Sequence, residues 1–222
     1  MPPVPLEATA EAVSYHRVRF TYDPDRAIVW RVLCEYLQRF VVEGQPVLEL
    51  GAGYGEFSRF IRSERKWALD RNPELAGYWQ DEVCPLIQSA LDPIPLPAAS
   101  VGTVFASNFL EHFTLEECQA ILAEVQRVLM PGGRLIVVQP NFRLEPGRYF
   151  DDYTHKTAFT DAGFADFLRS LGWRTVQEEP RFMPFSMKSK LPRWGWLVRL
   201  YLALPFRPLA GQFLVVAESP GE

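Results

Sequence analysis

Apolar positions along this chain follow two different spacings, and the two alternate from one end to the other. Helical spacing, with apolar residues three or four apart, marks residues 26–43, 115–129 and 161–171. Short apolar runs, typical of strands buried on both faces, occupy residues 47–50, 67–69, 101–106, 134–138 and 213–217. Helices that alternate with buried strands predict an α/β fold, in which helices cover both faces of a mostly parallel sheet.

Cap and turn residues predict where these elements begin and end. Thr114 and Glu117 have capping-box spacing before the helix whose apolar positions are Cys118, Ile121, Leu122, Val125 and Leu129. The Pro-Gly-Gly sequence at 131–133 is expected to end that helix, and Thr160 to cap the next one, which ends at Gly172. We expect residues 1–25 to form an N-terminal arm and residues 26–222 a single domain, with strand six at 173–182 and an insert at about 184–210 before strand seven.

The most informative local feature is a glycine-rich bend, which reads E-L-G-A-G-Y-G from Glu49 to Gly55. Glycines at alternate positions let a ligand approach the backbone, and a helix from residue 56 would point its first N–H groups at the bend. A dinucleotide site would read G-x-G-x-x-G. The different spacing, with Glu49 beside the bend, favours a ligand that carries an ammonium group over one that carries a pyrophosphate.

Further motifs follow in a fixed order. Asp70 ends a second apolar run about twenty residues on, where a carboxylate can accept hydrogen bonds from ribose hydroxyls. Residues 96–113 then hold Leu-Pro, a short turn, an apolar strand and the pair Glu111 and His112. The sequence R-V-L-M-P-G-G closes the series at residues 127–133.

Together these motifs, over about residues 45–140, resemble the small-molecule branch of the class I S-adenosylmethionine-dependent methyltransferases (types 11 and 23). One position departs from the pattern, because Gly102 stands where that family commonly has Asp. The resemblance implies a Rossmann-like, seven-stranded sheet with an antiparallel last strand, and S-adenosylmethionine as cofactor. The cofactor residues that it implies are Glu49, Gly51, Ala52, Gly53, Gly55, Asp70, Arg71 and Asn108.

The acceptor is expected over the carboxyl ends of strands four and five. Methyl transfer from a sulfonium needs mainly alignment of the two reactants, and a general base only when the acceptor is a hydroxyl. The loop at 149–156 offers His155 as the candidate base and Asp152 as its orienting partner. His112 is the rival base, and side-chain hydrogen bonds that merely order the loop remain the alternative.

Composition narrows the class of protein. The chain has 222 residues, 48% of them hydrophobic, which is enough for one substantial core. Its net charge of −4 argues against general nucleic-acid binding. Cys34, Cys84 and Cys118 fit neither a disulfide framework nor a zinc site, and we find no secretory signal and no transmembrane run, so we expect a cytoplasmic protein.

Three other functions were weighed. Methyltransferases that act on nucleic-acid bases carry paired prolines after strand four, whereas residues 107–110 read S-N-F-L. A metal-dependent enzyme would need clustered acids at strand ends, and only Asp151 and Asp152 come near this, so no metal is expected. A non-catalytic S-adenosylmethionine-binding partner or regulator stays open, because an intact cofactor site does not prove turnover.

The insert is unusually basic and aromatic. Residues 180–217 contain no acid and six cations, namely Arg181, Lys188, Lys190, Arg193, Arg199 and Arg207. One helical face could carry Trp194, Leu197, Val198, Tyr201 and Leu202. Contact with a membrane surface or lipid-linked substrate, packing on the sheet, and a homodimer interface are the alternatives. By resemblance alone, the acceptor is a small molecule, with a saccharide or glycolipid hydroxyl as the more specific expectation.

Overall fold

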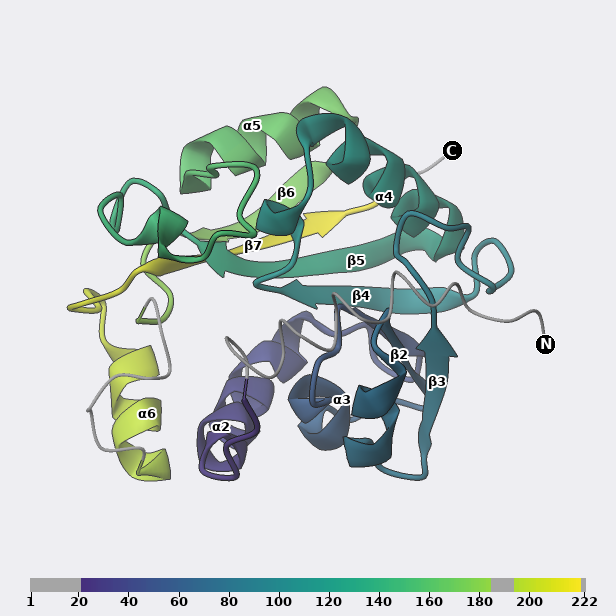
Figure 1. Ribbon diagram of the computed structural model, residues 1–222, viewed down its shortest axis with the longest axis horizontal. Coiled ribbons are helices and arrows are strands. Elements are labelled where there is room, and N and C mark those ends of the chain that lie inside the picture. Colours follow the sequence, from purple (N-terminus) through teal and green to yellow (C-terminus); the bar gives the residue numbers. More distant parts are fainter. Residues whose placement is uncertain (1–20, 185–193, 221–222) are drawn as a thin grey trace.

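A seven-stranded sheet forms the centre of the molecule, with helices on both faces (Figure 1). A computed structural model describes residues 21–184 and 194–220. The strands are β1 (Val47–Leu50), β2 (Lys66–Asp70), β3 (Val83–Ile87), β4 (Val101–Ser107), β5 (Leu129–Pro140), β6 (Arg174–Glu179) and β7 (Gln212–Glu218). They lie in the order β3-β2-β1-β4-β5-β7-β6, and β7 runs antiparallel to both of its neighbours. The predicted α/β sandwich with an antiparallel last strand is confirmed.

The helices divide between the two faces of the sheet (Figure 1). One layer contains α2 (Arg26–Leu37), α3 (Glu56–Phe60) and α6 (Gly195–Ala203), and the other contains α4 (Leu115–Val128) and α5 (Asp161–Ser170). Short 3-10 helices are η1 (Gln38–Phe40), η2 (Pro73–Tyr78), η3 (Leu110–His112) and η4 (Tyr149–Asp151). Each layer encloses its own hydrophobic core against the sheet.

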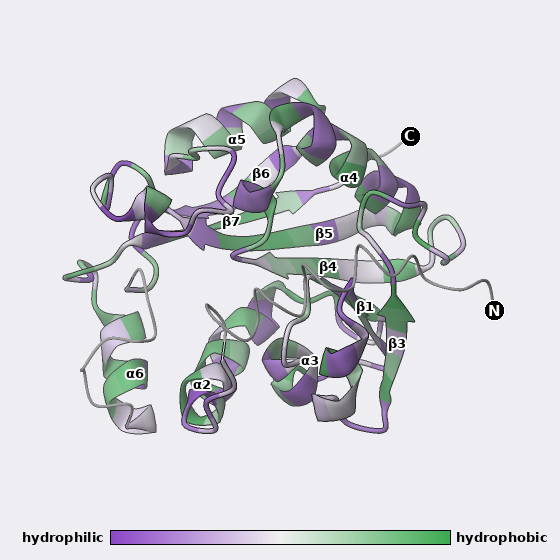
Figure 2. Ribbon diagram, in the orientation of Figure 1, coloured by the Kyte–Doolittle hydropathy of each residue, from purple (hydrophilic) through white to green (hydrophobic). Residues whose placement is uncertain are grey.

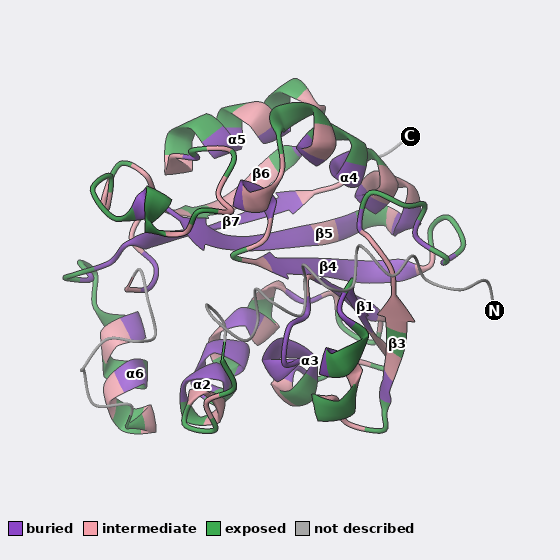
Figure 3. Ribbon diagram, in the orientation of Figure 1, coloured by how far each residue is buried: buried purple, intermediate pink, exposed green. Residues whose placement is uncertain are grey.

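Side chains of the central strands point alternately to the two faces of the sheet, so each strand contributes residues to both cores. In β4, Val104 and Ala106 belong to the α4 and α5 side, whereas Phe105 between them belongs to the α2 side. There its ring stacks on that of Phe57 from α3, with centroids 3.8 Å apart. The central strands β4 and β5 are therefore hydrophobic (Figure 2) and largely buried (Figure 3).

The start of α4 follows the predicted capping box. The Thr114 hydroxyl accepts a hydrogen bond from the Glu117 N–H at 3.2 Å, and the Glu117 carboxylate accepts one from the Thr114 N–H at 2.8 Å. The predicted inward residues Cys118, Ile121, Leu122 and Val125 are buried. The helix ends at Val128, before the Pro-Gly-Gly sequence, because Leu129 already pairs with Val101 of β4.

Other predicted boundaries were wrong by a few residues. The helix expected over 26–43 ends at Leu37 and continues only as η1, and strand six is shorter than 173–182. The sequence pattern did not identify β3, because Pro85 interrupts it. Pro85 lies opposite Ala68 of β2, and β3 is an edge strand, where a residue without an N–H is tolerated.

The insert contributes α6, whose buried residues Val198 and Leu202 pack in the same core as α2. Trp194, which was expected on one helical face with these residues, precedes α6 as its N-terminal cap and is 60% exposed. Most of the expected N-terminal arm lies outside the described residues, as do Lys188, Lys190 and Arg193. Among the described residues, no helix is long and apolar enough to cross a membrane.

Two cations of the insert are neutralised by acids from other elements. The Arg199 guanidinium donates two hydrogen bonds, each 2.9 Å long, to the carboxylate of Glu35 in α2. Arg207 is buried and forms an ion pair of 2.5 Å with Glu179. The local positive field expected from an insert without acids is therefore weaker than its sequence suggests.

Candidate functional site

A cavity of about 1250 Å³ opens where the carboxyl ends of β1, β2, β3 and β4 meet. Its lining includes seven of the eight predicted cofactor residues, which are Glu49, Gly51, Ala52, Gly53, Asp70, Arg71 and Asn108. Gly55, the eighth, is not among the described lining residues and instead precedes α3 as its N-terminal cap. The cofactor residues expected from separate parts of the sequence thus meet at one place.

The glycines of the bend are required by backbone conformation and by close packing. Gly51, Gly53 and Gly55 have φ angles of +60°, +54° and +73°, a region that side chains disfavour. A Cβ on Gly51 would lie 2.3 Å from the Phe109 ring, and one on Gly55 would lie 2.5 Å from the Trp79 ring. The close approach expected for a ligand is therefore made, at these two glycines, by aromatic rings of the protein itself.

Asp70 connects the bend to the end of β2. One carboxylate oxygen accepts a hydrogen bond from the Gly53 N–H, and the other accepts one from the Asn72 N–H, both at 2.9 Å. The residue is only 7% exposed. A carboxylate has further lone pairs on each oxygen, so these bonds leave acceptor capacity for a ligand in the cavity.

Glu49 is a second buried carboxylate, on the penultimate residue of β1. One of its oxygens accepts hydrogen bonds from the N–H and the hydroxyl of Ser58, at 3.0 Å and 2.5 Å. Burial raises the pKa of Glu49 to about 8, although the bonds from Ser58 act in the opposite direction. An acid that resists ionisation in this environment is suited to a cationic ligand group that would restore its charge.

The segment after β4 closes the cavity from the other side. Asn108 adopts a left-handed conformation with φ of +48°, and its side-chain oxygen accepts a hydrogen bond of 2.7 Å from Gln212 of β7. Its amide group donates a hydrogen bond to the Ser107 hydroxyl at 3.0 Å. These contacts hold Asn108 in the cavity wall between the cofactor bend and the short helix η3.

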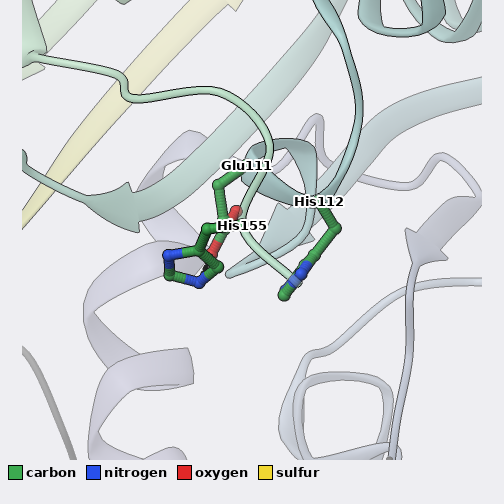
Figure 4. Close-up of side chains that lie close together, drawn as sticks. All are labelled: Glu111, His112 and His155. Carbon is green, nitrogen blue, oxygen red and sulfur yellow. Dashed lines mark ion pairs between the residues drawn. The ribbon is translucent and has the colours of Figure 1, made fainter. Parts of the chain in front are cut away.

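A polar cluster of Glu111, His112 and His155 lies further along the cavity wall (Figure 4). Glu111 and His112 come from η3, and His155 comes from the loop before α5. The rings of the two histidines are 5.0 Å apart, and Nε2 of His155 is 3.9 Å from a carboxylate oxygen of Glu111. The structure thus brings together the two predicted base candidates, which the sequence separates by more than forty residues.

Asp152 is linked to His112 through Thr154. The Thr154 hydroxyl donates to the Asp152 carboxylate at 2.6 Å and lies 2.8 Å from Nδ1 of His112. Because that hydroxyl has a single proton, it acts as acceptor toward Nδ1, which assigns the His112 proton to Nδ1. Burial lowers the pKa of His112 to about 4, so its ring is neutral. The predicted role of Asp152 as orienter of His155 stays a prediction, as does the base role.

The end of the cavity beyond this cluster is apolar. Its wall there is formed by α2, by the segment after β6, and by α6 with the segment that follows it, through Val29, Trp30, Leu33, Phe182, Met183, Leu197, Val198, Leu200, Leu204 and Leu209. Leu200, Leu204 and Leu209 are also exposed, so they mark an opening to solvent beside α6. In Figure 1, α6 stands on the side toward which β4 and β5 point.

Several lining residues were not predicted. Gln88 and Ser89 follow β3, and they were missed together with that strand. Arg26 and Glu56 form a largely buried ion pair of 2.7 Å at the cavity wall, which nothing in their spacing indicates. Glu111 was identified from the sequence only as part of a motif with His112, and its place in the cavity wall was not predicted.

The comparisons with known proteins agree with this geometry. Residues 48–137 match a protein family described as "Methyltransferase domain". A ubiquinone/menaquinone biosynthesis C-methyltransferase of Cupriavidus metallidurans is 24% identical over 206 residues, which cover 84% of this chain and 79% of that protein. A malonyl-[acyl-carrier protein] O-methyltransferase of Alcanivorax borkumensis is 30% identical over 154 residues, covering 61% of this chain and 50% of that protein.

Among solved structures, a putative methyltransferase from Haloferax volcanii, in complex with the Trm112 methyltransferase activator, has the same fold. Its TM-score is 0.71 at 18% identity, and the match covers 98% of this chain and 99% of that one.

Proposed function

We propose that the chain is a class I S-adenosylmethionine-dependent methyltransferase whose acceptor is a small molecule with a polar reacting hydroxyl and an apolar, lipid-like body. Its match to a methyltransferase domain and its methyltransferase relatives support an enzyme with S-adenosylmethionine as cofactor, and detectable methyl transfer would separate it from the non-catalytic binding protein considered from the sequence. One observation carries the proposal. A single cavity runs from the cofactor corner, past the polar cluster of Glu111, His112 and His155, to an apolar wall at α2 and α6.

At the cofactor end of the cavity, the carboxylates of Asp70 and Glu49 contact different groups of the cofactor in this proposal. Asp70 accepts hydrogen bonds from the ribose hydroxyls with the lone pairs that its backbone contacts leave available. Glu49 faces the ammonium group of the methionine portion, which stabilises the ionised carboxylate. Arg71 and Asn108 line the same end, and Gly55 acts by shaping the bend.

At the reacting end, the acceptor oxygen attacks the sulfonium methyl in line with the departing sulfur. The carbon–oxygen bond would form while the carbon–sulfur bond breaks, sulfur would keep the electron pair, and the hydroxyl proton would pass to a nearby base, for which His155 and His112 are the candidates. Alignment of the two reactants in a site that excludes water supplies most of the acceleration. His112 and His155, with Asp152 linked to the first of them, lie where that hydroxyl would be held.

The apolar wall favours a lipid or glycolipid hydroxyl over a free saccharide. A saccharide has hydroxyls on all sides, and an apolar wall would leave many of them without hydrogen bonds. The two relatives are named for ubiquinone/menaquinone biosynthesis and for malonyl-[acyl-carrier protein], which supports a small-molecule acceptor. We extend the proposal to peripheral contact with a lipid surface through the exposed side chains of α6 that surround the opening.

The test is incubation of the purified protein with methyl-labelled S-adenosylmethionine and fractionated cell extracts. The fractions are total lipid, polysaccharide, water-soluble metabolites and protein. The proposal expects label in the lipid fraction. Label confined to water-soluble metabolites or to polysaccharide would contradict the lipid-like acceptor and leave the methyltransferase assignment intact.

A further inference from the structure

Glu111 is a buried acid without a hydrogen bond. It is fully buried, and neither carboxylate oxygen makes a hydrogen bond within the described part of the chain. Burial raises its pKa to about 8; backbone amides of Glu111 and Phe109 partly offset this rise without reaching hydrogen-bond geometry. Buried carboxylates are normally paired, hydrogen-bonded or bound to metal ions. Among the described residues, Nε2 of His155 lies 3.9 Å from a carboxylate oxygen of Glu111, beyond hydrogen-bond distance.

Together with two histidines, this acid forms a set of potential metal ligands. One potential ligand atom from each of Glu111, His112 and His155 lies within 4.8 Å of the others (Figure 4). Two imidazoles and one carboxylate suit divalent first-row transition metals, whereas Mg²⁺ and Ca²⁺ prefer oxygen ligands alone. Metal–ligand distances for these groups are about 2.1 Å, so the side chains would each move inward by roughly 0.5 Å.

His112 also has the supporting contact that a metal-bound imidazole requires. Its Nδ1–H is directed to the Thr154 hydroxyl, which donates in turn to the Asp152 carboxylate. This arrangement sets the ring orientation and leaves the lone pair on Nε2. Carboxylate-backed imidazoles of this kind are usual among metal ligands.

We propose that Glu111, His112 and His155 bind one divalent transition-metal ion, of which Zn²⁺ is the probe, and that its open coordination positions face the acceptor. Three protein ligands leave such positions, as in catalytic metal sites. A hydroxyl bound there would lose its proton to water more readily and attack the methyl group as an oxyanion. This inference goes beyond the proposed function and replaces the predicted base role of His155. Metal binding itself does not depend on which acceptor the enzyme uses, whereas the activation of a hydroxyl rests on the proposed function.

The direct test is isothermal titration calorimetry of the full chain after treatment with a chelator, with ZnCl₂, MnCl₂ and MgCl₂ as separate titrants. We expect one Zn²⁺ or Mn²⁺ per chain and much weaker binding of Mg²⁺. Glu111→Gln and His155→Ala should each weaken Zn²⁺ binding at least about 100-fold, since loss of even an outer contact typically costs 10- to 100-fold. The matched control is Glu116→Gln, which removes an exposed carboxylate nearby and should leave the affinity unchanged.

A second measurement uses the unmodified protein, so it does not depend on whether the variants fold. Co²⁺ bound to two imidazoles and a carboxylate gives visible d–d absorption, and Zn²⁺ should displace it with the same stoichiometry. No such absorption, Zn²⁺ binding below one per chain, or equal affinity in Glu111→Gln and Glu116→Gln would overturn the proposal. In that outcome the three side chains are a buried polar contact, and the methyltransferase assignment is unaffected.

Discussion

Two buried carboxylates line the cofactor end of the cavity, and they are held in different ways. Both oxygens of Asp70 accept backbone N–H groups from the chain around it, whereas Glu49 relies on Ser58 alone. Asp70 therefore shapes the bend as well as lining the cavity. Glu49 is the acid whose charge depends on what occupies the cavity.

Asp70→Ala is expected to weaken binding of S-adenosylhomocysteine by one to two orders of magnitude. It removes the proposed ribose acceptor together with two backbone contacts, and hydrogen bonds to charged groups contribute about 1–3 kcal/mol. Asp70→Asn is the matched control, because one oxygen can still accept from an N–H. Calorimetry checks this, and wild-type affinity in Asp70→Ala would count against a ribose-binding role.

Binding of the cofactor product at about pH 6.5 should release close to one proton. With a pKa of about 8, Glu49 is protonated there, and the ligand ammonium, with a pKa near 8, is charged and favours the ionised acid. Calorimetry in two buffers of different ionisation enthalpy measures this release. Glu49→Gln should abolish it, and equal release in both proteins would show that another group titrates.

The raised pKa of Glu49 also determines how the free energy of unfolding changes with pH. A carboxyl with a raised pKa in the folded state lowers the free energy of unfolding progressively as the pH rises from about 4.5 to 8. Without ligand, Glu49→Gln should therefore be more stable relative to the wild type at pH 8 than at pH 4.5.

At the scale of elements, the junction of β1 with α3 has little room for added side-chain atoms. Gly51 and Gly44 have similar φ angles, +60° and +67°. A Cβ on Gly51 would overlap the Phe109 ring, whereas one on Gly44 meets no atom within 4 Å. A substitution at Gly44 therefore measures backbone strain alone, whereas one at Gly51 measures strain together with close packing.

Gly44→Ala should lower the free energy of unfolding by about 1 kcal/mol, through strain alone. Gly51→Ala should lower it by roughly 1–3 kcal/mol more, because the added methyl group overpacks the site. Urea unfolding of the two variants measures the difference. Equal losses would mean that Phe109 moves aside without cost.

The elements that could be predicted from the sequence are those marked by a motif of a few consecutive residues. The capping box of α4 depends on four consecutive residues, and the glycine bend on seven, so both were found. The edge strand β3 was missed because Pro85 breaks its pattern, and its tolerance depends on its place in the sheet. The pairing of Arg199 with Glu35, which neutralises one cation of the insert, joins residues 164 positions apart and leaves no local trace.

In the candidate site, too, only the residues with a local sequence signal could be predicted. The cofactor residues follow strand ends, and parallel strands bring those ends together, so the sequence could place most of them. The cluster of Glu111 with His155 requires the loop before α5 to fold back over η3. No spacing of residues along the sequence predicts that this loop folds back over η3.

At the scale of the whole molecule, α6 exposes an apolar surface beside the cavity opening. Trp194 and Trp196 are each 60% exposed, and their rings lie 5.9 Å apart. Interfacial tryptophans are typical of helices that rest on lipid headgroups. Since Arg199 is already paired with Glu35, the attraction should come mainly from apolar contact.

The protein should therefore co-sediment with anionic liposomes, and Trp194→Ser with Trp196→Ser should largely abolish this. Tyr78→Ser, which changes an aromatic side chain of η2 that is 50% exposed, is the control and should have no effect. A protein that ignores liposomes but dissociates from a dimer when the two tryptophans are replaced would show that α6 is a homodimer interface.

The cavity at the ends of β1, β2, β3 and β4 is the proposed cofactor site, and the proposed function depends on it. Isothermal titration of the wild-type protein with S-adenosylhomocysteine, and separately with NADH, tests that claim most directly. We predict one S-adenosylhomocysteine per chain with micromolar affinity and no binding of NADH, because the bend carries an acid and lacks the dinucleotide spacing. Micromolar binding of NADH with none of S-adenosylhomocysteine would contradict the account.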